Sequence, residues 1–90
     1  MKVKISSTLQ SYTNGLREFE INKPTLHELL DELNSRYPGI KFRFIDEQDK
    51  IRRNMRIFVN GDVVHNIFTP LKENSEIFIV HYNPEYKRRG

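Results

Sequence analysis

The sequence predicts an α+β fold in which one main helix packs on one face of a mixed sheet of four to five strands. Three observations indicate this class. Several short segments alternate apolar and polar residues, as strands with one buried face do, and two Asn-Gly pairs are typical of tight turns between strands. One segment has apolar residues at helical spacing. At 90 residues, the chain is expected to form a single domain.

The first two elements are predicted to be strands joined as a hairpin. Apolar and polar residues alternate over residues 2–6 and again over residues 18–21. Asn14-Gly15 lies between these segments and is a strong turn signal, because both residue types tolerate positive φ.

The helix is predicted to extend from Thr25 to Tyr37, and Pro38-Gly39 follows it as a stop signal. Thr25 and Glu28 have the spacing of a capping box, in which each side chain satisfies a backbone donor at the helix start. Apolar residues recur on one face, which we expect to pack in the core. The residues of this face are Leu26, Leu29, Leu30, Leu33 and Tyr37.

The segment after the helix is harder to assign. Residues 40–44 give no clear signal for a helix or a strand, and residues 46–50 form a polar connection, so no element is assigned to either. Met55 to Val59 then predicts a strand that turns at Asn60-Gly61 into a short return strand at residues 63–64.

The last strand is predicted within Glu76 to Tyr82, where four apolar residues follow one another without interruption. Pro84 ends this strand, because proline has no backbone N–H to donate to a neighbouring strand.

A single helix can cover only one face of this sheet, so the other face is expected to stay open. Alternation along the strands defines the residues on the helix side. These are Ile57, Val59, Ile77 and Ile79. The same alternation turns Phe58, Phe78 and Val80 outward, and an exposed apolar patch on a small domain usually marks a protein interface. The alternative is that residues 40–44 or the end of the chain cover these three apolar side chains, so that they are not exposed.

The net charge of +3 arises in the second half of the chain. One basic cluster is Arg52, Arg53 and Arg56, and the other is residues 87–89. The first cluster could form a polar rim around the apolar patch or a solvated loop, and the second could be a solvated basic tail or dock into an acidic groove of a partner protein. Nucleic-acid binding is the weaker alternative, because the basic residues are not interleaved with aromatic residues on a recognised nucleic-acid fold.

Several kinds of chemistry are not expected of this chain. It has no cysteine, which excludes a disulfide framework, a thiolate metal site and a cysteine nucleophile. His27, His65 and His81 are too scattered to predict a metal site, and no phosphate-binding glycine loop or glycine elbow around a serine occurs. We therefore expect a protein that is not itself an enzyme and needs no cofactor. No signal peptide or apolar run of about 18 residues is present, so a cytoplasmic protein without a membrane segment is expected.

The element order and two local patterns resemble the ubiquitin-like β-grasp sulfur carriers. In that family, which includes the small subunit of molybdopterin synthase and the carriers of thiamine and cysteine synthesis, a hydrophobic strand leads to a Val-Asn-Gly turn and a Pro-Leu pair precedes the last strand. This chain has Val59-Asn60-Gly61 and Pro70-Leu71. The resemblance covers residues 3–82 and implies a β-grasp domain over residues 1–82 with a flexible C-terminal tail over residues 83–90.

The resemblance also implies a function. In the family, an E1-like adenylating enzyme activates the C-terminal carboxylate with ATP, the product is converted to a thiocarboxylate, and a biosynthetic enzyme of the molybdopterin, cysteine or thiamine type accepts the sulfur. The activated carboxylate of this chain would be that of Gly90. The residues that would bind partners are Phe58, Phe78, Val80, Arg88 and Arg89.

One residue departs from the family pattern. The family ends in Gly-Gly, whereas here Arg89 precedes Gly90. A side chain at this position adds bulk and restricts φ and ψ in a tail that must pass through a narrow channel. A β-grasp module that binds a protein partner without sulfur chemistry is therefore the alternative function.

Overall fold

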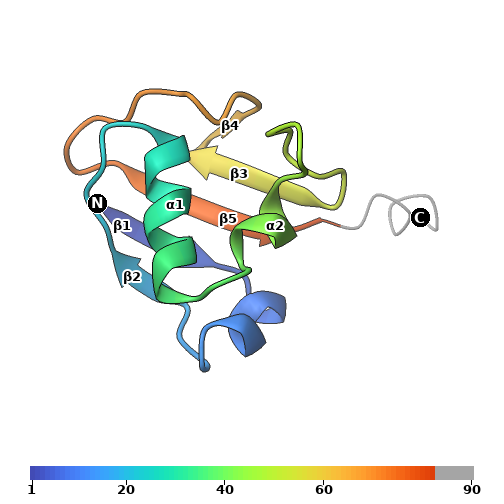
Figure 1. The fold of residues 1–90 in the computed structure, drawn as a ribbon. Coiled ribbons are helices and arrows are strands. Elements are labelled where there is room, and N and C mark those ends of the chain that lie inside the picture. Colours follow the sequence, from blue (N-terminus) through green and yellow to red (C-terminus); the bar gives the residue numbers. More distant parts are fainter. Residues whose placement is uncertain (83–90) are drawn as a thin grey trace, which may run out of the picture.

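A computed structural model describes residues 1–82 of the chain (Figure 1). The elements are β1 (Lys2–Ile5), the 3-10 helix η1 (Ser7–Tyr12), β2 (Glu18–Glu20), α1 (Leu26–Arg36), α2 (Lys41–Phe44), β3 (Met55–Val59), β4 (Asp62–Val64) and β5 (Glu76–His81). The tail expected over residues 83–90 lies outside the described residues.

The five strands form one mixed sheet in the order β2-β1-β5-β3-β4. The first and last strands, β1 and β5, pair in parallel at its centre, and every other neighbouring pair is antiparallel. Helix α1 crosses one face of this sheet (Figure 1). The predicted α+β fold, with a mixed sheet and one main helix, is confirmed.

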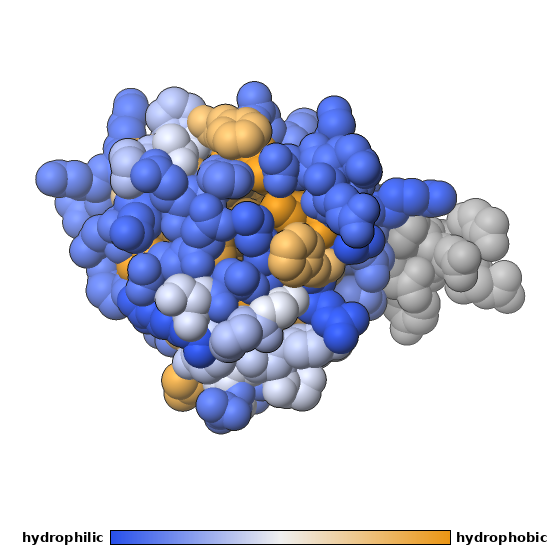
Figure 2. All heavy atoms as spheres, in the orientation of Figure 1, coloured by the Kyte–Doolittle hydropathy of each residue, from blue (hydrophilic) through white to orange (hydrophobic). Residues whose placement is uncertain are grey.

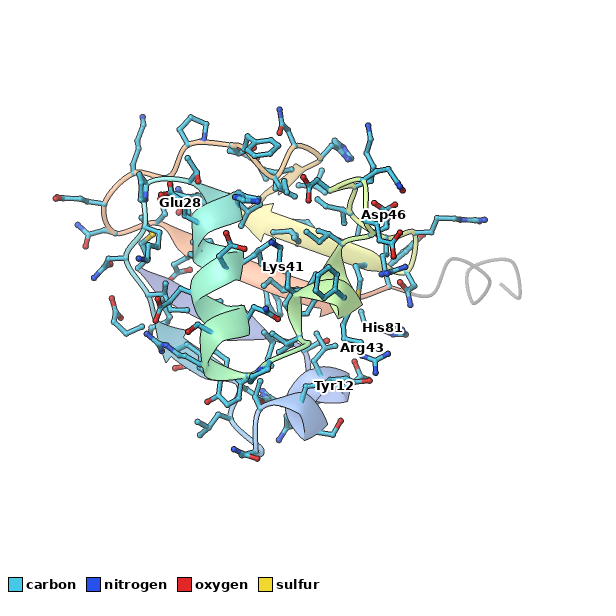
Figure 3. All side chains as sticks on the ribbon, in the orientation of Figure 1. Tyr12, Glu28, Lys41, Arg43, Asp46 and His81 are labelled. Carbon is cyan, nitrogen blue, oxygen red and sulfur yellow. The ribbon has the colours of Figure 1, made fainter. Side chains whose placement is uncertain are left out.

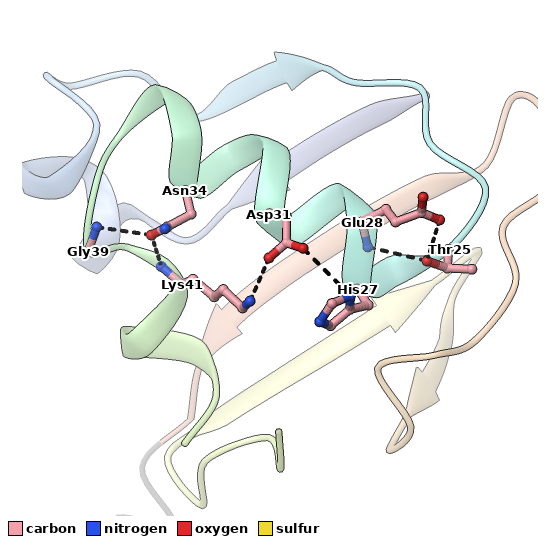
Figure 4. A network of polar contacts seen from close by, with 7 residues as sticks. All are labelled: Thr25, His27, Glu28, Asp31, Asn34, Gly39 and Lys41. Atoms are coloured by element: carbon pink, nitrogen blue, oxygen red, sulfur yellow. Dashed lines mark hydrogen bonds and ion pairs between the residues drawn. The ribbon is translucent and has the colours of Figure 1, made fainter. Parts of the chain in front are cut away.

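The start of α1 agrees with the capping motif. The Thr25 hydroxyl oxygen accepts a hydrogen bond from the Glu28 N–H at 3.2 Å. The Glu28 carboxylate lies 3.0 Å from the same hydroxyl instead of binding the Thr25 N–H, so only half of the capping box forms (Figure 4). The cap satisfies a backbone donor that has no partner within the helix.

The end of α1 is held by Asn34, whose side-chain oxygen accepts hydrogen bonds from the N–H groups of Gly39 at 2.9 Å and Lys41 at 3.1 Å (Figure 4). The last helical residue is Arg36, and Tyr37 is the C-cap. Gly39 has φ of +98°, a conformation that glycine adopts without steric cost. The chain can therefore reverse here into α2.

The core lies between α1 and the sheet. The four leucines predicted for the inner face of α1 are fully buried, and Tyr37 packs against the core while partly exposed. On the sheet, Ile57, Ile77 and Ile79 are buried as expected, and Val59 is half-buried against the core.

The connection between β1 and β2 is more elaborate than a simple hairpin. The two strands pair antiparallel, and the turn is present, with positive φ at Asn14 and Gly15. Before the turn, however, the chain forms η1, which carries Leu9 into the core. Alternation of polar and apolar residues does not reveal a short 3-10 helix, because its single buried side chain fits a strand equally well.

Within this segment, Lys41–Phe44 form a single helical turn, α2, flanked by the buried residues Ile40 and Ile45. Phe42 and Phe44 are two residues apart, so the helical turn directs them to different sides, and Phe44 is fully buried while Phe42 is 52% exposed. The Arg43 guanidinium lies over the Tyr12 ring of η1 at 4.8 Å from its centroid (Figure 3). Since α2 lies on the α1 side of the sheet (Figure 1), it does not cover Phe58 or Phe78.

The surface on the helix side is mostly hydrophilic, and its apolar side chains form separate patches (Figure 2). None of the helices within residues 1–82 is long and apolar enough to span a bilayer.

Candidate functional site

The face of the sheet opposite α1 carries a row of side chains that crosses all five strands. Strand pairing sets Val63 opposite Phe58, Phe58 opposite Phe78, and Phe78 opposite Lys4. Lys4 is in turn opposite Glu18 on the edge strand β2. Directly paired residues share a face of a sheet. The row is thus apolar over β4, β3 and β5 and charged over β1 and β2.

The apolar half of this row is open to solvent. Phe78 is 44% exposed and Val63 is 43% exposed, while Phe58 and Val80 are half-buried. Val80 lies next to the row, opposite Arg56 of β3. We call Phe58, Val63, Phe78 and Val80 the sheet-face patch. The predicted outward orientation of Phe58, Phe78 and Val80 agrees with the observed register.

Val63 was not singled out from the sequence, although a signal for it was present. A two-residue Asn60-Gly61 loop fixes the register of a hairpin, so Val59 pairs with Asp62 and Phe58 pairs with Val63. This pairing turns Val63 to the same face as Phe58 and enlarges the patch.

Charged residues border the patch on the β1 side. A depression of about 520 Å³ lies over β1 and β5, and its lining includes Lys2, Lys4, Arg17, Glu18 and Phe78. The Lys4 ammonium and the Glu18 carboxylate are 3.9 Å apart and both exposed, so their attraction is weak and easily exchanged for a partner's charge. The border is therefore polar and adaptable, as the rim of a protein interface usually is.

Of the three arginines in the first basic cluster, Arg56 borders the patch. It lies on β3 opposite Val80, and its guanidinium is 4.1 Å from the ring centroid of Tyr82. Arg52 and Arg53 precede β3 and are exposed. The cluster thus combines both expected roles, since one arginine lines the rim and two lie in a loop.

The pKa of Asp46 is held below its ordinary value in the loop before this cluster. Hydrogen bonds from the backbone N–H of Lys50 and of Gln48 stabilise the charged carboxylate, and the positive charges of Arg52 and Lys50 add to this effect. The hydrogen bonds close the loop, so this shift reflects local structure and indicates no catalytic role.

The histidines do not come together. His27 lies on α1, with its Nδ1 at 3.6 Å from the Asp31 carboxylate and its ring stacked on Phe68. His65 follows β4. His81, which is labelled in Figure 3, ends β5. Within residues 1–82, no group of three histidine, aspartate or glutamate side chains is placed to hold a metal ion.

The remaining expected site residues are at the end of the chain. Arg88, Arg89 and the activation site Gly90 lie outside the described residues. The structure does show where the described chain ends. The Tyr82 N–H donates to the carbonyl oxygen of Asn54 at 2.6 Å, so the chain leaves beside the start of β3.

Known structures share this fold. The chain superposes with a TM-score of 0.84 and 27% identity on the Amycolatopsis orientalis structure described as a BexX/CysO complex, covering 91% of this chain and 94% of that chain. Mycobacterium tuberculosis CysO gives a TM-score of 0.84 at 24% identity, covering 91% and 98%. A putative molybdopterin converting factor subunit 1 from Pyrococcus furiosus gives 0.65 at 24%, covering 91% and 95%. The search of curated proteins found no match to this sequence.

With one helix across a five-stranded mixed sheet whose terminal strands pair in parallel, the chain is a ubiquitin-like β-grasp protein with the fold of the sulfur carriers. The model of the ThiS family matches residues 3–82. The chain belongs to the ThiS family, which confirms the resemblance to the β-grasp sulfur carriers.

Proposed function

We propose that this protein is a sulfur carrier that is a substrate of its partners and not itself an enzyme. An E1-like adenylating enzyme would activate the carboxylate of Gly90, and a sulfur-accepting biosynthetic enzyme of the molybdopterin, cysteine or thiamine type would take up the sulfur. Because the activation consumes ATP, the proposed setting is the cytoplasm.

The observation that carries the proposal is the ThiS-family match across the whole described fold. The position of the chain end supports it. The described part of the chain ends at Tyr82 beside the start of β3, and eight residues follow. A segment of that length can span at most about 26 to 29 Å, which is long enough to reach into a partner's active site.

The proposed reaction proceeds in three steps. A carboxylate oxygen of Gly90 attacks the α-phosphorus of ATP, and pyrophosphate leaves with the electrons of the broken P–O bond. Hydrosulfide then attacks the acyl carbon, AMP leaves, and a proton is released to give the thiocarboxylate. The sulfur next attacks an electrophilic carbon of the acceptor's substrate, whose leaving group departs with the electrons of the bond to that carbon, and water then hydrolyses the acyl–sulfur bond and restores the carboxylate. This chain supplies the reacting carboxylate, and the partners supply catalysis.

The sheet-face patch is the proposed docking surface for these partners. Two phenylalanines and two valines sit at its centre, and charged residues border it, which is the usual composition of a protein interface. The family relationship supports the same assignment, since a CysO protein occurs in a structure described as a complex with BexX. Arg88 and Arg89 are proposed to contact an acidic groove as the tail enters the partner.

Mass spectrometry of the protein isolated from its natural source tests the proposal directly. Replacement of one oxygen by sulfur adds about 16 Da to the intact mass. Incubation with the adenylating enzyme and ATP should release pyrophosphate, and deletion of Gly90 should abolish that release while leaving the fold unchanged. A chain that is never thiocarboxylated and releases no pyrophosphate would contradict the proposal.

The second candidate function is a β-grasp interaction module without sulfur chemistry. The open sheet-face patch favours it, because this surface can bind a protein whether or not the terminus is activated. Arg89 favours it as well, since it interrupts the family's diglycine. Partner binding through the patch without any activation of the terminus would select this second function.

A further inference from the structure

A basic depression lies beside the point where the described chain ends. It has a volume of about 320 Å³ and is lined by Arg52, Arg53, Arg56 and His65 together with apolar residues of β3, β4 and the preceding loop. Among the residues that the structure describes, no carboxylate lines it. We call this depression the arginine pocket. It is separate from the sheet-face patch, none of whose four residues lines it.

Two of the three arginines of this pocket, Arg52 and Arg56, are held in place by backbone carbonyl groups and not by carboxylates of residues 1–82. Arg52 Nε donates to the carbonyl oxygen of Phe42 at 2.8 Å, and Arg56 Nη1 donates to the carbonyl oxygens of Met55 at 2.8 Å and Arg53 at 3.1 Å. Within residues 1–82, no ion pair includes any of the three arginines. Carbonyl contacts orient a guanidinium but leave its charge and its other N–H donors for an anion.

One nearby carboxylate offsets a part of this charge. The Arg52 charge helps to hold the pKa of Asp46 low, although the main cause of that shift is the Lys50 N–H. Arg53 and Arg56 make no such contribution to the pKa of Asp46. The pocket therefore stays positive near neutral pH, and an anionic group is the chemistry that complements it.

The arginine pocket lies at the base of the tail. Arg56, which lines it, stacks on the ring of Tyr82 at 4.1 Å, and the Tyr82 N–H binds the carbonyl oxygen of Asn54, which immediately precedes Met55. Any protein that receives the residues after Tyr82 in a channel must bring the mouth of that channel against these arginines.

The length of the tail identifies which anion the pocket meets. Eight extended residues separate Tyr82 from the reacting carboxylate by up to about 26 to 29 Å, whereas charges in 0.1 M salt are screened over about 10 Å. The ATP phosphates at the end of the channel are therefore too distant for the pocket to bind. Carboxylates at the channel mouth are within reach and form charge-assisted hydrogen bonds with guanidinium groups.

We propose that the arginine pocket binds a carboxylate-lined surface of the adenylating enzyme, at the mouth of the channel that receives residues 83–90. This inference rests on the proposed function. It adds a second contact, electrostatic in nature, to the apolar contact of the sheet-face patch. Such contacts mainly set the rate and specificity of association.

The test measures pyrophosphate release by the adenylating enzyme and ATP at increasing concentrations of the full-length carrier. Arg53→Glu is the test variant, because Arg53 is exposed and lines the pocket. Lys72→Glu is the matched control, with the same charge change on an exposed residue in the loop before β5, at the opposite end of that strand from Tyr82. Thermal unfolding of both variants checks that the fold is retained.

Arg53→Glu should raise KM by about tenfold and leave kcat unchanged. The reason is that the lost contact stabilises the bound carrier equally before the reaction and in its transition state. Lys72→Glu should change KM by less than about twofold, and added salt should raise the KM of the wild type more than that of Arg53→Glu. An unchanged KM for a folded Arg53→Glu would overturn this inference and leave the proposed function standing.

Two further outcomes would also overturn it. If the wild type releases no pyrophosphate, the proposed function fails and this inference fails with it. If a short oligouridylate binds the wild type, is bound much more weakly by Arg53→Glu and blocks activation, the pocket is a site for RNA phosphates instead of protein carboxylates.

Discussion

At the scale of single residues, Phe78 connects the two halves of the row on the open face. It pairs with Phe58 on one side and with Lys4 on the other, and it is 44% exposed. An aromatic side chain that is exposed in the free protein and surrounded by apolar and charged neighbours has the properties of an interface anchor. Its replacement should therefore affect binding more than folding.

Phe78→Ala and Phe58→Ala should each weaken binding to the adenylating enzyme by more than about 1 kcal/mol, or roughly fivefold in Kd, while the fold remains intact. Titration calorimetry measures the binding, and circular dichroism checks the fold. Phe42→Ala is the matched control, because Phe42 is 52% exposed but belongs to α2 on the other side of the sheet. Loss of folding in the Phe58 or Phe78 variant would assign that residue to the core instead.

Arg89 stands where the family has glycine, so its replacement tests whether this side chain hinders activation of the terminus. Arg89→Gly restores the diglycine and removes bulk where the tail enters a narrow channel, so the rate of pyrophosphate release should stay the same or rise. The assay compares initial rates of the two proteins at equal concentration. A large decrease would mean that the partner recognises the Arg89 side chain. No release from either protein would favour the interaction module.

At the scale of elements, α1 depends on its buried face. Leu30 is fully buried, whereas Glu32 lies on the outer side, 3.2 Å from Arg36 Nε and 4.0 Å from Lys23 Nζ. Leu30→Ala should lower the free energy of unfolding by roughly 2 to 5 kcal/mol, and Glu32→Ala should change it by only about 0.5 kcal/mol. Urea unfolding measures both values. Equal effects would show that the face of α1 is wrongly assigned.

The loop between α2 and β3 depends on Asp46. Its carboxylate accepts hydrogen bonds from Gln48 N at 2.8 Å and Lys50 N at 3.0 Å, within a loop closed by the bridge between Ile45 and Ile51. These bonds are the structural reason why the pKa of Asp46 is lowered.

Because the pKa is lower in the folded state, the ionised Asp46 stabilises the fold above the ordinary value of 3.8, and this stabilisation is lost as the pH falls through the folded-state pKa. Asp46→Asn should therefore unfold at lower urea concentration than the wild type at pH 7. The difference should shrink as the pH falls below 3.8 and through the folded-state pKa of Asp46. A difference that grows on acidification would contradict the sign of the shift.

The sequence correctly predicted the elements that are defined by contacts between residues close together in the chain. Thr25 caps α1, and Asn60-Gly61 forms a two-residue turn with positive φ at both residues, because each motif needs only its immediate neighbours. It did not predict η1 or α2. Leu9 and Phe44 become buried through contacts with distant parts of the chain, and short helical turns of this kind have no periodicity long enough to detect.

The candidate site was predicted only in part, because the pattern within one strand is local whereas the pairing of strands joins distant parts of the chain. Alternation along β3 and β5 identified Phe58, Phe78 and Val80, but it gave no information on which strands are neighbours. The placement of Lys4 opposite Phe78 depends on the parallel pairing of β1 with β5, two segments at opposite ends of the chain. Likewise, the arginine pocket required the knowledge that Tyr82 returns to Arg56.

At the scale of the whole molecule, the buried core of the described residues 1–82 lies within residues 3–79. Removal of residues 83–90 should therefore change the free energy of unfolding by no more than about 0.5 kcal/mol, and pyrophosphate release should be lost completely. Chemical denaturation of the truncated and full-length proteins provides the comparison. A clear loss of stability would show that the domain extends beyond residue 82.

The parallel pairing of β1 and β5 has a mechanical consequence. Met1 lies at one end of the sheet, where its ammonium group is 2.6 Å from the Glu20 carboxylate, and Tyr82 lies at the other end. A force that pulls the two ends apart therefore acts along both strands, so that their hydrogen bonds are loaded in shear and share the load instead of breaking one after another. Resistance to such force depends on the unfolding barrier more than on equilibrium stability. A partner that draws the tail inward would thus pull against the most resistant direction of the fold.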